Sequence, residues 1–372
     1  MTNPSTKTNS AEKRLLALDA LRGFDMLWIV GFGLLIKAFA KATDYGWATA
    51  LAAQLSHAPW HGFRGWDLIF PLFMFLVGAS IPYAIRGKLE KNTPKKQLIW
   101  RILRRTILLI FLGIIYNGAL SDFSDPRYAS VLGQIGIGYC IAAMLVLFTG
   151  KFKHVLITFI VVSLIVTVAQ LCIPVPQHGA NVLTPEGSMN AYLDQLLLPG
   201  KLYAKYYDPE GVLNIVSGVG ITLIGVLAGL LLRQNKWNDY QKTGIMAGTG
   251  TLLILAALFI HPWYPINKEI WTVPFNLLTG GISLILLAVF YLSTDTLKLT
   301  RWNFPLRVIG MNAITIYMAA RVLNFQGVSL FLFGGIASLS DEWKRTVILL
   351  GVILIQWLLL FLLYKKKIFL RV

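Results

Sequence analysis

The chain alternates between long apolar runs and short polar segments. About 20 mainly apolar residues are enough for a helix to cross the hydrocarbon core of a bilayer. Ten segments reach that length, at residues 21–40, 67–86, 98–118, 130–149, 153–173, 211–233, 243–261, 271–293, 305–322 and 345–364. A shorter apolar run, 328–339, contains two adjacent glycines, which favours a re-entrant or interfacial segment. The pattern predicts an all-α transmembrane bundle with about ten spans and one such segment.

Composition supports a membrane setting. Of the 372 residues, 56% are hydrophobic and 14% are charged, and the mean hydropathy of +0.64 lies outside the range of soluble globular domains. No soluble domain interrupts the pattern. We therefore expect residues 1–372 to form one membrane domain.

The distribution of positive charge predicts the topology. A net charge of +17 could indicate a nucleic-acid-binding protein, but the lysines and arginines fall in short clusters between apolar runs, so no nucleic-acid partner is expected. Ten spans with a cytoplasmic N-terminus place 24 of the 34 basic residues inside. An eleventh span would place the basic tail at 365–371 on the external side of the membrane. We therefore predict cytoplasmic termini, a flexible segment at 1–14, and external loops at 41–66 and 174–210.

The end of the first predicted external loop gathers reactive side chains. His57, Trp60, His61 and Trp66 precede Asp67, which opens an apolar run. Such a cluster can be a simple interfacial anchor, with rings at headgroup level. An ionisable group in an apolar run costs free energy, and such groups are usually functional. A histidine paired with a carboxylate can act as general base or nucleophile. The two histidines are four residues apart, but Pro59 between them disfavours a helical metal site, so no metal is predicted.

The same segment carries a family resemblance. The stretch 57–62, His-Ala-Pro-Trp-His-Gly, and the stretch 67–71, Asp-Leu-Ile-Phe-Pro, resemble the active-site segment of the heparan-α-glucosaminide N-acetyltransferase family. Further similar segments follow in family order, at 15–23, 75–81, 100–101, 112–115, 131–136, 207–211, 267–268 and 310–313. Each fragment is weak alone, but their shared order makes the resemblance specific. The chain looks like the bacterial form of the family, which consists of the membrane domain only.

The resemblance implies a membrane acetyltransferase of the bacterial inner membrane. Such an enzyme moves acetyl from cytoplasmic acetyl-CoA to the amine of a terminal glucosamine on the external face, so the expected partners are acetyl-CoA, an amino sugar or glycan fragment, and membrane lipid. His57 matches the catalytic histidine, as an acetylated intermediate or as a general base, and Asp67 is its expected partner. A homodimer is expected only by analogy.

Candidate binding residues fall into two groups. Five arginines near predicted cytoplasmic helix ends could hold the CoA phosphates, although topology and phospholipid contact would also explain them: Arg101, Arg104, Arg105, Arg301 and Arg307. Six residues are candidates for substrate binding, with anchoring, helix capping or helix–helix contact as the alternatives: Trp60, His61, Asp208, Glu210, Asn312 and Asn117.

Two features leave other functions open. Many relatives carry an asparagine near the outer end of the first helix, whereas residues 28–33 contain none here. A sugar or small-molecule transporter would share the spans and the intramembrane polar residues, although the inverted repeats typical of transporters are not found. A structural membrane protein without chemistry is a third hypothesis.

Overall fold

A computed structural model describes residues 15–118 and 124–369. All regular elements in these residues are helices, which confirms the predicted all-α class. The segment predicted to be flexible, 1–14, lies outside the described residues. In chain order the elements are α1 (Leu16–Leu27), η1 (Trp28–Phe32), α2 (Gly33–Thr43), α3 (Gly46–Gln54), η2 (Gly65–Leu68), α4 (Ile69–Glu90), α5 (Lys95–Tyr116), α6 (Val131–Phe148), α7 (Phe152–Leu171), α8 (Met189–Leu197), α9 (Val212–Arg233), α10 (Asp239–Ile260), α11 (Val273–Tyr291), η3 (Leu292–Thr296), α12 (Phe304–Gly310), α13 (Ala313–Val322), α14 (Phe325–Ala337) and α15 (Asp341–Lys365).

The described helices are those of an integral membrane protein. Eight are long and apolar enough to cross a bilayer, and the pair α13 and α14, bent by 76°, would be a ninth. The predicted count of about ten also includes α5, which is long enough but carries three arginines in its last eighteen residues. It further includes the broken segment formed by α12 and α13. The short apolar run 328–339, which we predicted to be re-entrant or interfacial, lies mostly in the 13-residue helix α14.

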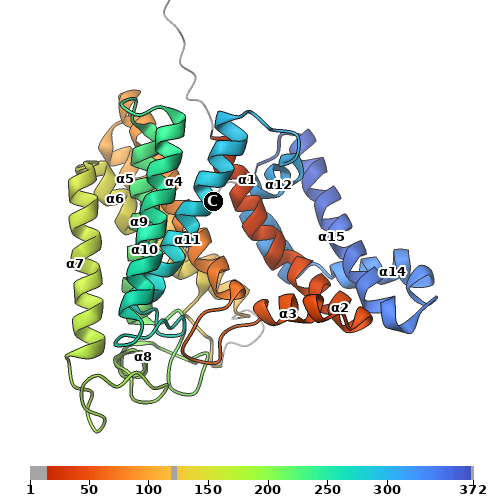
Figure 1. Cartoon of the computed structure of the whole chain (residues 1–372), viewed down its shortest axis with the longest axis horizontal. Helices are drawn as coiled ribbons and strands as arrows, with labels where there is room; N and C mark the ends of the chain where they lie inside the picture. Colours follow the sequence, from red (N-terminus) through yellow and green to blue (C-terminus); the bar gives the residue numbers. More distant parts are fainter. Residues whose placement is uncertain (1–14, 119–123, 370–372) are drawn as a thin grey trace, which may run out of the picture.

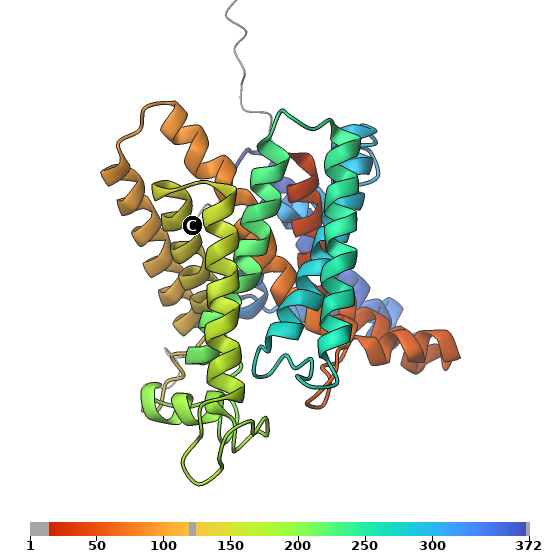
Figure 2. The ribbon, with the colours of Figure 1, turned by 60° about the vertical axis from the view of Figure 1, so that its left-hand side comes forward.

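Burial separates the core helices from those at the periphery. The apolar windows of α9, of α11 with η3, and of α4 with η2 are 78%, 72% and 67% buried, whereas those of α7 and α10 are each 17% buried. Figures 1 and 2 show α7 and α10 on the outside of the bundle. An apolar helix with so little protein cover can face lipid at low cost. The bundle therefore has a core built on α4, α9 and α11, with α7 and α10 at its periphery.

Small residues set the spacing of the helices that carry the site. A Cβ at Gly78 of α4 would lie 2.0 Å from the backbone oxygen of Thr222 on α9, and one at Gly225 would lie 2.0 Å from that of Phe75. Glycines at a helix contact let two backbones approach closely, which is how membrane helices gain packing energy. The α4–α9 contact thereby fixes the position of α4.

The first span is not a continuous α-helix. Residues 28–32 form the π-helical turn η1, in which Gly31 has φ of +154°, a backbone conformation that side chains rarely tolerate. Beyond this break, a Cβ at Gly33 would lie 2.5 Å from the Trp66 ring. The glycine thus makes room for Trp66 beside the first span.

The two ends of the described chain lie at the same end of the bundle. The start of α1 and the end of α15 lie at the end opposite to α8 and the loop between α3 and α4 (Figure 1). That loop contains His57. We call this the His57 end.

Candidate active site

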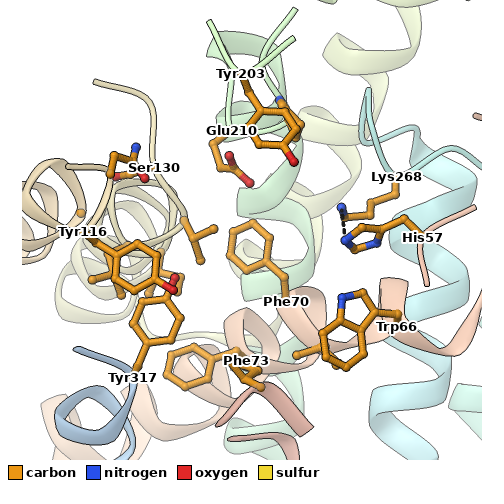
Figure 3. Close-up of a pocket in the computed structure, with 18 of the residues that line it drawn as sticks. His57, Trp66, Phe70, Phe73, Tyr116, Ser130, Tyr203, Glu210, Lys268 and Tyr317 are labelled. Carbon is orange, nitrogen blue, oxygen red and sulfur yellow. Dashed lines mark hydrogen bonds between the residues drawn. The ribbon is translucent and has the colours of Figure 1, made fainter. Parts of the chain in front are cut away.

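A cavity of about 410 Å³ opens beside His57. Its walls come from α1, η1, η2, α4, α5, α6 and α13, and its rim comes from the segments that precede η2, α6, α9 and α11. Apolar and aromatic side chains dominate the walls, and the rim is polar: His57, Arg127, Tyr203, Glu210, Lys268 and Glu269. In Figure 3, His57 and Lys268 lie on one side, the rings of Tyr116 and Tyr317 lie on the other, and Phe70 lies between them. Such a cavity can hold an organic substrate and orient it at a polar rim.

His57 and Asp67 form a close pair at this rim. The His57 Nδ1 atom lies 2.6 Å from Asp67 Oδ1. The second carboxylate oxygen, Oδ2, accepts hydrogen bonds from the backbone N–H groups of Ala58, at 3.2 Å, and Arg64, at 2.9 Å. Asp67 lies in the short 3-10 helix η2 and is only 1% exposed. The carboxylate therefore holds the loop and the imidazole at the same time.

This pairing determines which imidazole nitrogen is available for chemistry. Because a carboxylate only accepts hydrogen bonds, Nδ1 carries the proton and Nε2 keeps its lone pair in the neutral ring. The side chain of His57 is 45% exposed, whereas that of Asp67 is fully buried. The His57–Asp67 pair thus presents a basic nitrogen to a substrate in the cavity.

Lys268 reaches the same nitrogen from the segment before α11. Its Nζ lies 3.4 Å from His57 Nε2 and 3.5 Å from Glu269 Oε1 (Figure 3 draws the first contact). Asn214 of α9 donates from Nδ2 to the Glu269 carbonyl at 2.7 Å, and the Tyr207 hydroxyl donates to Glu269 Oε2 at 3.2 Å. These contacts hold the segment that carries Lys268 in place.

A second charged cluster lies at the rim. Arg127 donates to both carboxylate oxygens of Asp208, at 2.7 and 2.6 Å, and also to Glu210. Its guanidinium lies 4.8 Å from the Tyr203 ring centre. Burial raises the pKa of Glu210, and the charge of Arg127 opposes that rise. Glu210 lines the cavity, whereas Asp208 is buried behind it as the partner of Arg127.

Trp60 and His61 hold the loop and do not line the cavity. Trp60 Nε1 donates to the Leu183 carbonyl at 2.8 Å, and His61 Nδ1 lies 3.3 Å from Asn267 Nδ2. Burial lowers the pKa of His61, and His261 adds to the effect. A substrate-binding role for these two residues stays a prediction, because their recorded contacts join protein segments.

The two predicted asparagines have different surroundings. Asn117 lines the cavity, and its Nδ2 donates to the Ala129 carbonyl at 2.6 Å. Asn312 is buried between α12 and α13, and its Nδ2 donates to the Ile368 carbonyl at 3.1 Å. The structure brings Asn117 to the site and Asn312 to the chain's C-terminal segment.

The five predicted arginines do not form one cluster. Arg307 lines a second cavity of about 180 Å³, with Leu16, Asp19, Phe304, Met311 and Tyr364. Its Nε is buried and has no hydrogen-bond partner in the described residues. Arg105 lies over the Tyr139 ring at 4.4 Å, and the remaining three are exposed: Arg101, Arg104 and Arg301. Of the five, Arg307 is the one that lines either of these two cavities.

Lys268, Glu269 and Arg127 are cavity residues that our sequence prediction did not single out. Lys268 belongs to the matched segment 267–268, which was a weak signal without an assigned role. The stacked rings of Tyr116 and Tyr317, 4.4 Å apart, were likewise missed, because they come from helices distant in sequence. Within residues 15–118 and 124–369, no three His, Cys, Asp or Glu side chains gather in a way that could hold a metal ion.

Comparison with known proteins gives two mammalian relatives. The chain is 25% identical to "Heparan-alpha-glucosaminide N-acetyltransferase" of Mus musculus over 428 aligned positions, and 25% identical to the Homo sapiens protein of the same name over 430. Each alignment covers 99% of this chain and 62% of the relative, so the chain spans less than two thirds of their length. Residues 14–186 match the family "Domain of unknown function (DUF5009)". The resemblance seen in the motifs is confirmed as a distant, family-level match.

Proposed function

We propose that this protein is a membrane acetyltransferase that transfers acetyl from acetyl-CoA to the amine of an amino sugar. The observation that carries the proposal is the His57–Asp67 pair, whose unprotonated Nε2 lies at the rim of a cavity. The names of the two relatives support the reaction class. Acceptor identity, donor identity and the external position of the site are parts of the proposal.

The pair fits acyl transfer by either of two routes. In the first, Nε2 takes a proton from the acceptor amine while the amine nitrogen attacks the thioester carbon. In the second, Nε2 attacks that carbon itself and the amine then removes the acetyl group. Both routes break the bond between carbon and sulfur, and both leave a proton on the CoA thiol. In both routes the proton must stay on Nδ1, in the hydrogen bond to Asp67, because only then is Nε2 free to react.

The protein must bind the phosphate groups of the donor as well as its acetyl group. The second cavity offers Arg307, whose partly unsatisfied guanidinium is suited to an anionic oxygen. Asp19 of α1 lines this cavity and Met26 lines the larger one, and seven residues of helix span about 10 Å. We propose that CoA phosphates bind near Arg307 and that the acetyl end reaches His57.

The acceptor amine needs a negative or polar partner near His57. Glu269 and Glu210 both line the cavity, and aromatic rings such as Tyr203 offer apolar faces to a sugar ring. An amino sugar fits this combination: its ammonium group can bind beside the carboxylates, and once it has released one proton to water the neutral amine can attack. We propose that it enters at the rim, with its amine directed to His57.

The test uses the full chain, purified and reconstituted in lipid vesicles. With acetyl-CoA and glucosamine we expect release of CoA thiol and an acetylated sugar detected by mass spectrometry. His57→Ala should lower the rate about 10²-fold or more, since it removes the base or nucleophile. The matched control is His178→Ala, which removes an exposed histidine that does not line the cavity. No product from the wild-type protein with any amino sugar, or equal rates for wild type and His57→Ala, would reject the proposal and favour the transporter hypothesis.

A further inference from the structure

Acyl transfer needs a group that the His57–Asp67 pair does not supply. When a nucleophile adds to a thioester, the carbonyl oxygen becomes an oxyanion, and a positioned hydrogen-bond donor at that oxygen is often the largest single contribution to the rate. In the neutral ring, His57 donates its only N–H to Asp67 and presents a lone pair at Nε2. A donor must therefore come from another residue at the rim.

We propose that Lys268 is a catalytic residue that stabilises this oxyanion. Its Nζ lies 3.4 Å from the Nε2 atom of His57, and its side chain is only 13% exposed. The proposal rests on the acetyltransferase function proposed above and adds a named residue to it.

The position of Nζ suits the reacting carbonyl group. The acetyl carbon must come close to Nε2, whether Nε2 attacks it or receives the proton of the attacking amine. The carbonyl oxygen lies one bond beyond that carbon, so a donor already next to Nε2 can reach it. In the resting site, the Lys268 ammonium donates toward the Nε2 lone pair, and when that lone pair is used the same donor turns to the oxygen.

The other cations near the rim are held elsewhere. Arg64 Nη1 donates to the Ser56 hydroxyl at 2.7 Å and to the His57 carbonyl at 3.1 Å. Arg127 is bound by Asp208 and Glu210. Lys268 is therefore the cavity-lining cation of the described residues with a recorded contact to the reactive nitrogen.

Lys268 loses no proton in this step. The acceptor nitrogen bonds to the acetyl carbon, the bond between carbon and sulfur breaks, and the amine proton passes through His57 to the CoA sulfur. The lysine only donates a hydrogen bond to the oxygen while it is negatively charged. Its effect should therefore fall on the chemical step and not on binding.

The test compares Lys268→Gln, Lys268→Arg and the matched control Lys201→Gln in reconstituted full-length protein. Lys201 is an exposed lysine outside the cavity lining. For Lys268→Gln we expect kcat to fall about 10²- to 10³-fold, with the KM values for both substrates changed less than about threefold. Lys268→Arg should recover at least about tenfold of that loss because it keeps a cationic donor. Lys201→Gln should match the wild type.

The outcomes separate this inference from the proposed function. An inactive wild-type protein would overturn both. An active wild type with Lys268→Gln within about fivefold of its kcat, or with a raised acceptor KM and unchanged kcat, would overturn only the role of Lys268. Thermal unfolding checks the fold of each variant. If Lys268→Gln does not fold, Lys268→Met, which keeps an unbranched apolar chain, replaces it with the same expected result.

Discussion

Asp67 combines two roles that the sequence presents as alternatives. A carboxylate at the start of an apolar helix can cap that helix or orient a histidine. One of its oxygens contacts His57 Nδ1, while the other accepts from two backbone N–H groups. The two roles do not compete, because a carboxylate has two oxygens with separate lone pairs.

Replacing Asp67 by Asn should separate these roles. The amide oxygen can keep the backbone contacts, but the NH₂ group must then face His57 Nδ1 and will favour the tautomer that carries its proton on Nε2. We expect Asp67→Asn to lower acetyl transfer about 10²-fold or more, with thermal stability and acetyl-CoA affinity close to wild type. Turnover assays and thermal unfolding provide the measurements. Near-normal turnover by a folded variant would mean that Asp67 acts only as a cap.

The two histidines of the loop should respond differently to substitution. His61 contacts Asn267 at 3.3 Å and does not line the cavity. Loss of one hydrogen bond is worth about 1 kcal/mol, so His61→Ala should change the rate by no more than about fivefold. His57→Ala should lower the rate about 10²-fold or more in the same assay. Comparable losses from both variants would show that the loop acts as a unit and that the assignment of His57 is wrong.

Sequence reasoning reaches some of these contacts and not others. His57 and Asp67 are ten residues apart in one loop, so a motif can suggest their pairing. Lys268 lies 211 residues from His57, and its contact exists only after α1, α4, α9 and α11 have packed. No local pattern in a single sequence encodes such a distance. For the same reason Arg127, Tyr116 and Tyr317 were not anticipated.

At the scale of elements, hydropathy predicts the spans but not their irregularities. The predicted segment 21–40 lies within a helix that runs from Leu16 to Thr43 and is interrupted by the π-turn η1. The predicted loops 41–66 and 174–210 contain the short helices α3 and α8. Length and apolarity report what lipid requires of a segment, whereas breaks and short helices follow from tertiary contacts such as that of Gly33 with Trp66.

Helix α8 gives the His57 end a titratable contact. Asp194 is buried, and its carboxylate accepts from the backbone N–H groups of Asp208, at 2.9 Å, and Val212, at 2.8 Å. Burial raises the pKa of Asp194 from its ordinary 3.8 to about 6. The folded protein therefore binds this proton more tightly than the unfolded chain does. The contribution of Asp194 to the stability of the fold is therefore present below pH 3.8 and is lost as the pH rises through about 6.

Comparison with Asp194→Asn isolates this group from the other carboxylates. Asn does not titrate, so the stability difference between wild type and variant should move in favour of the wild type as the pH is lowered from 7 to 5. Thermal unfolding of both proteins across that range measures the difference. A gap that stays constant, or that moves the other way, would contradict the raised pKa of Asp194.

At the scale of the whole molecule, the positive charges and the helix packing agree on one arrangement. The two ends of the described chain lie opposite to the His57 end, which requires an even number of crossings (Figure 1). The predicted topology places 24 of the 34 basic residues on the cytoplasmic side and the His57 loop outside. Which end faces the cytoplasm is a prediction from charge alone, because packing is the same in either orientation.

Cysteine labelling in intact cells should decide this orientation. Cys172 is exposed at the end of α7, beside the segment 174–210, so a membrane-impermeant maleimide should label it without permeabilisation. In a background that lacks both native cysteines, Lys91→Cys, in the exposed turn between α4 and α5, and Lys366→Cys, after α15, should be labelled only once the membrane is opened. Labelling of both Lys91→Cys and Lys366→Cys in intact cells, without labelling of Cys172, would show that the topology is inverted. If Cys172 and Lys366→Cys were both labelled from outside, the number of crossings after α7 would be even, not odd as the ten-span count requires. The segment α13–α14 would then have to supply one more crossing, contrary to the excess of basic residues in the tail.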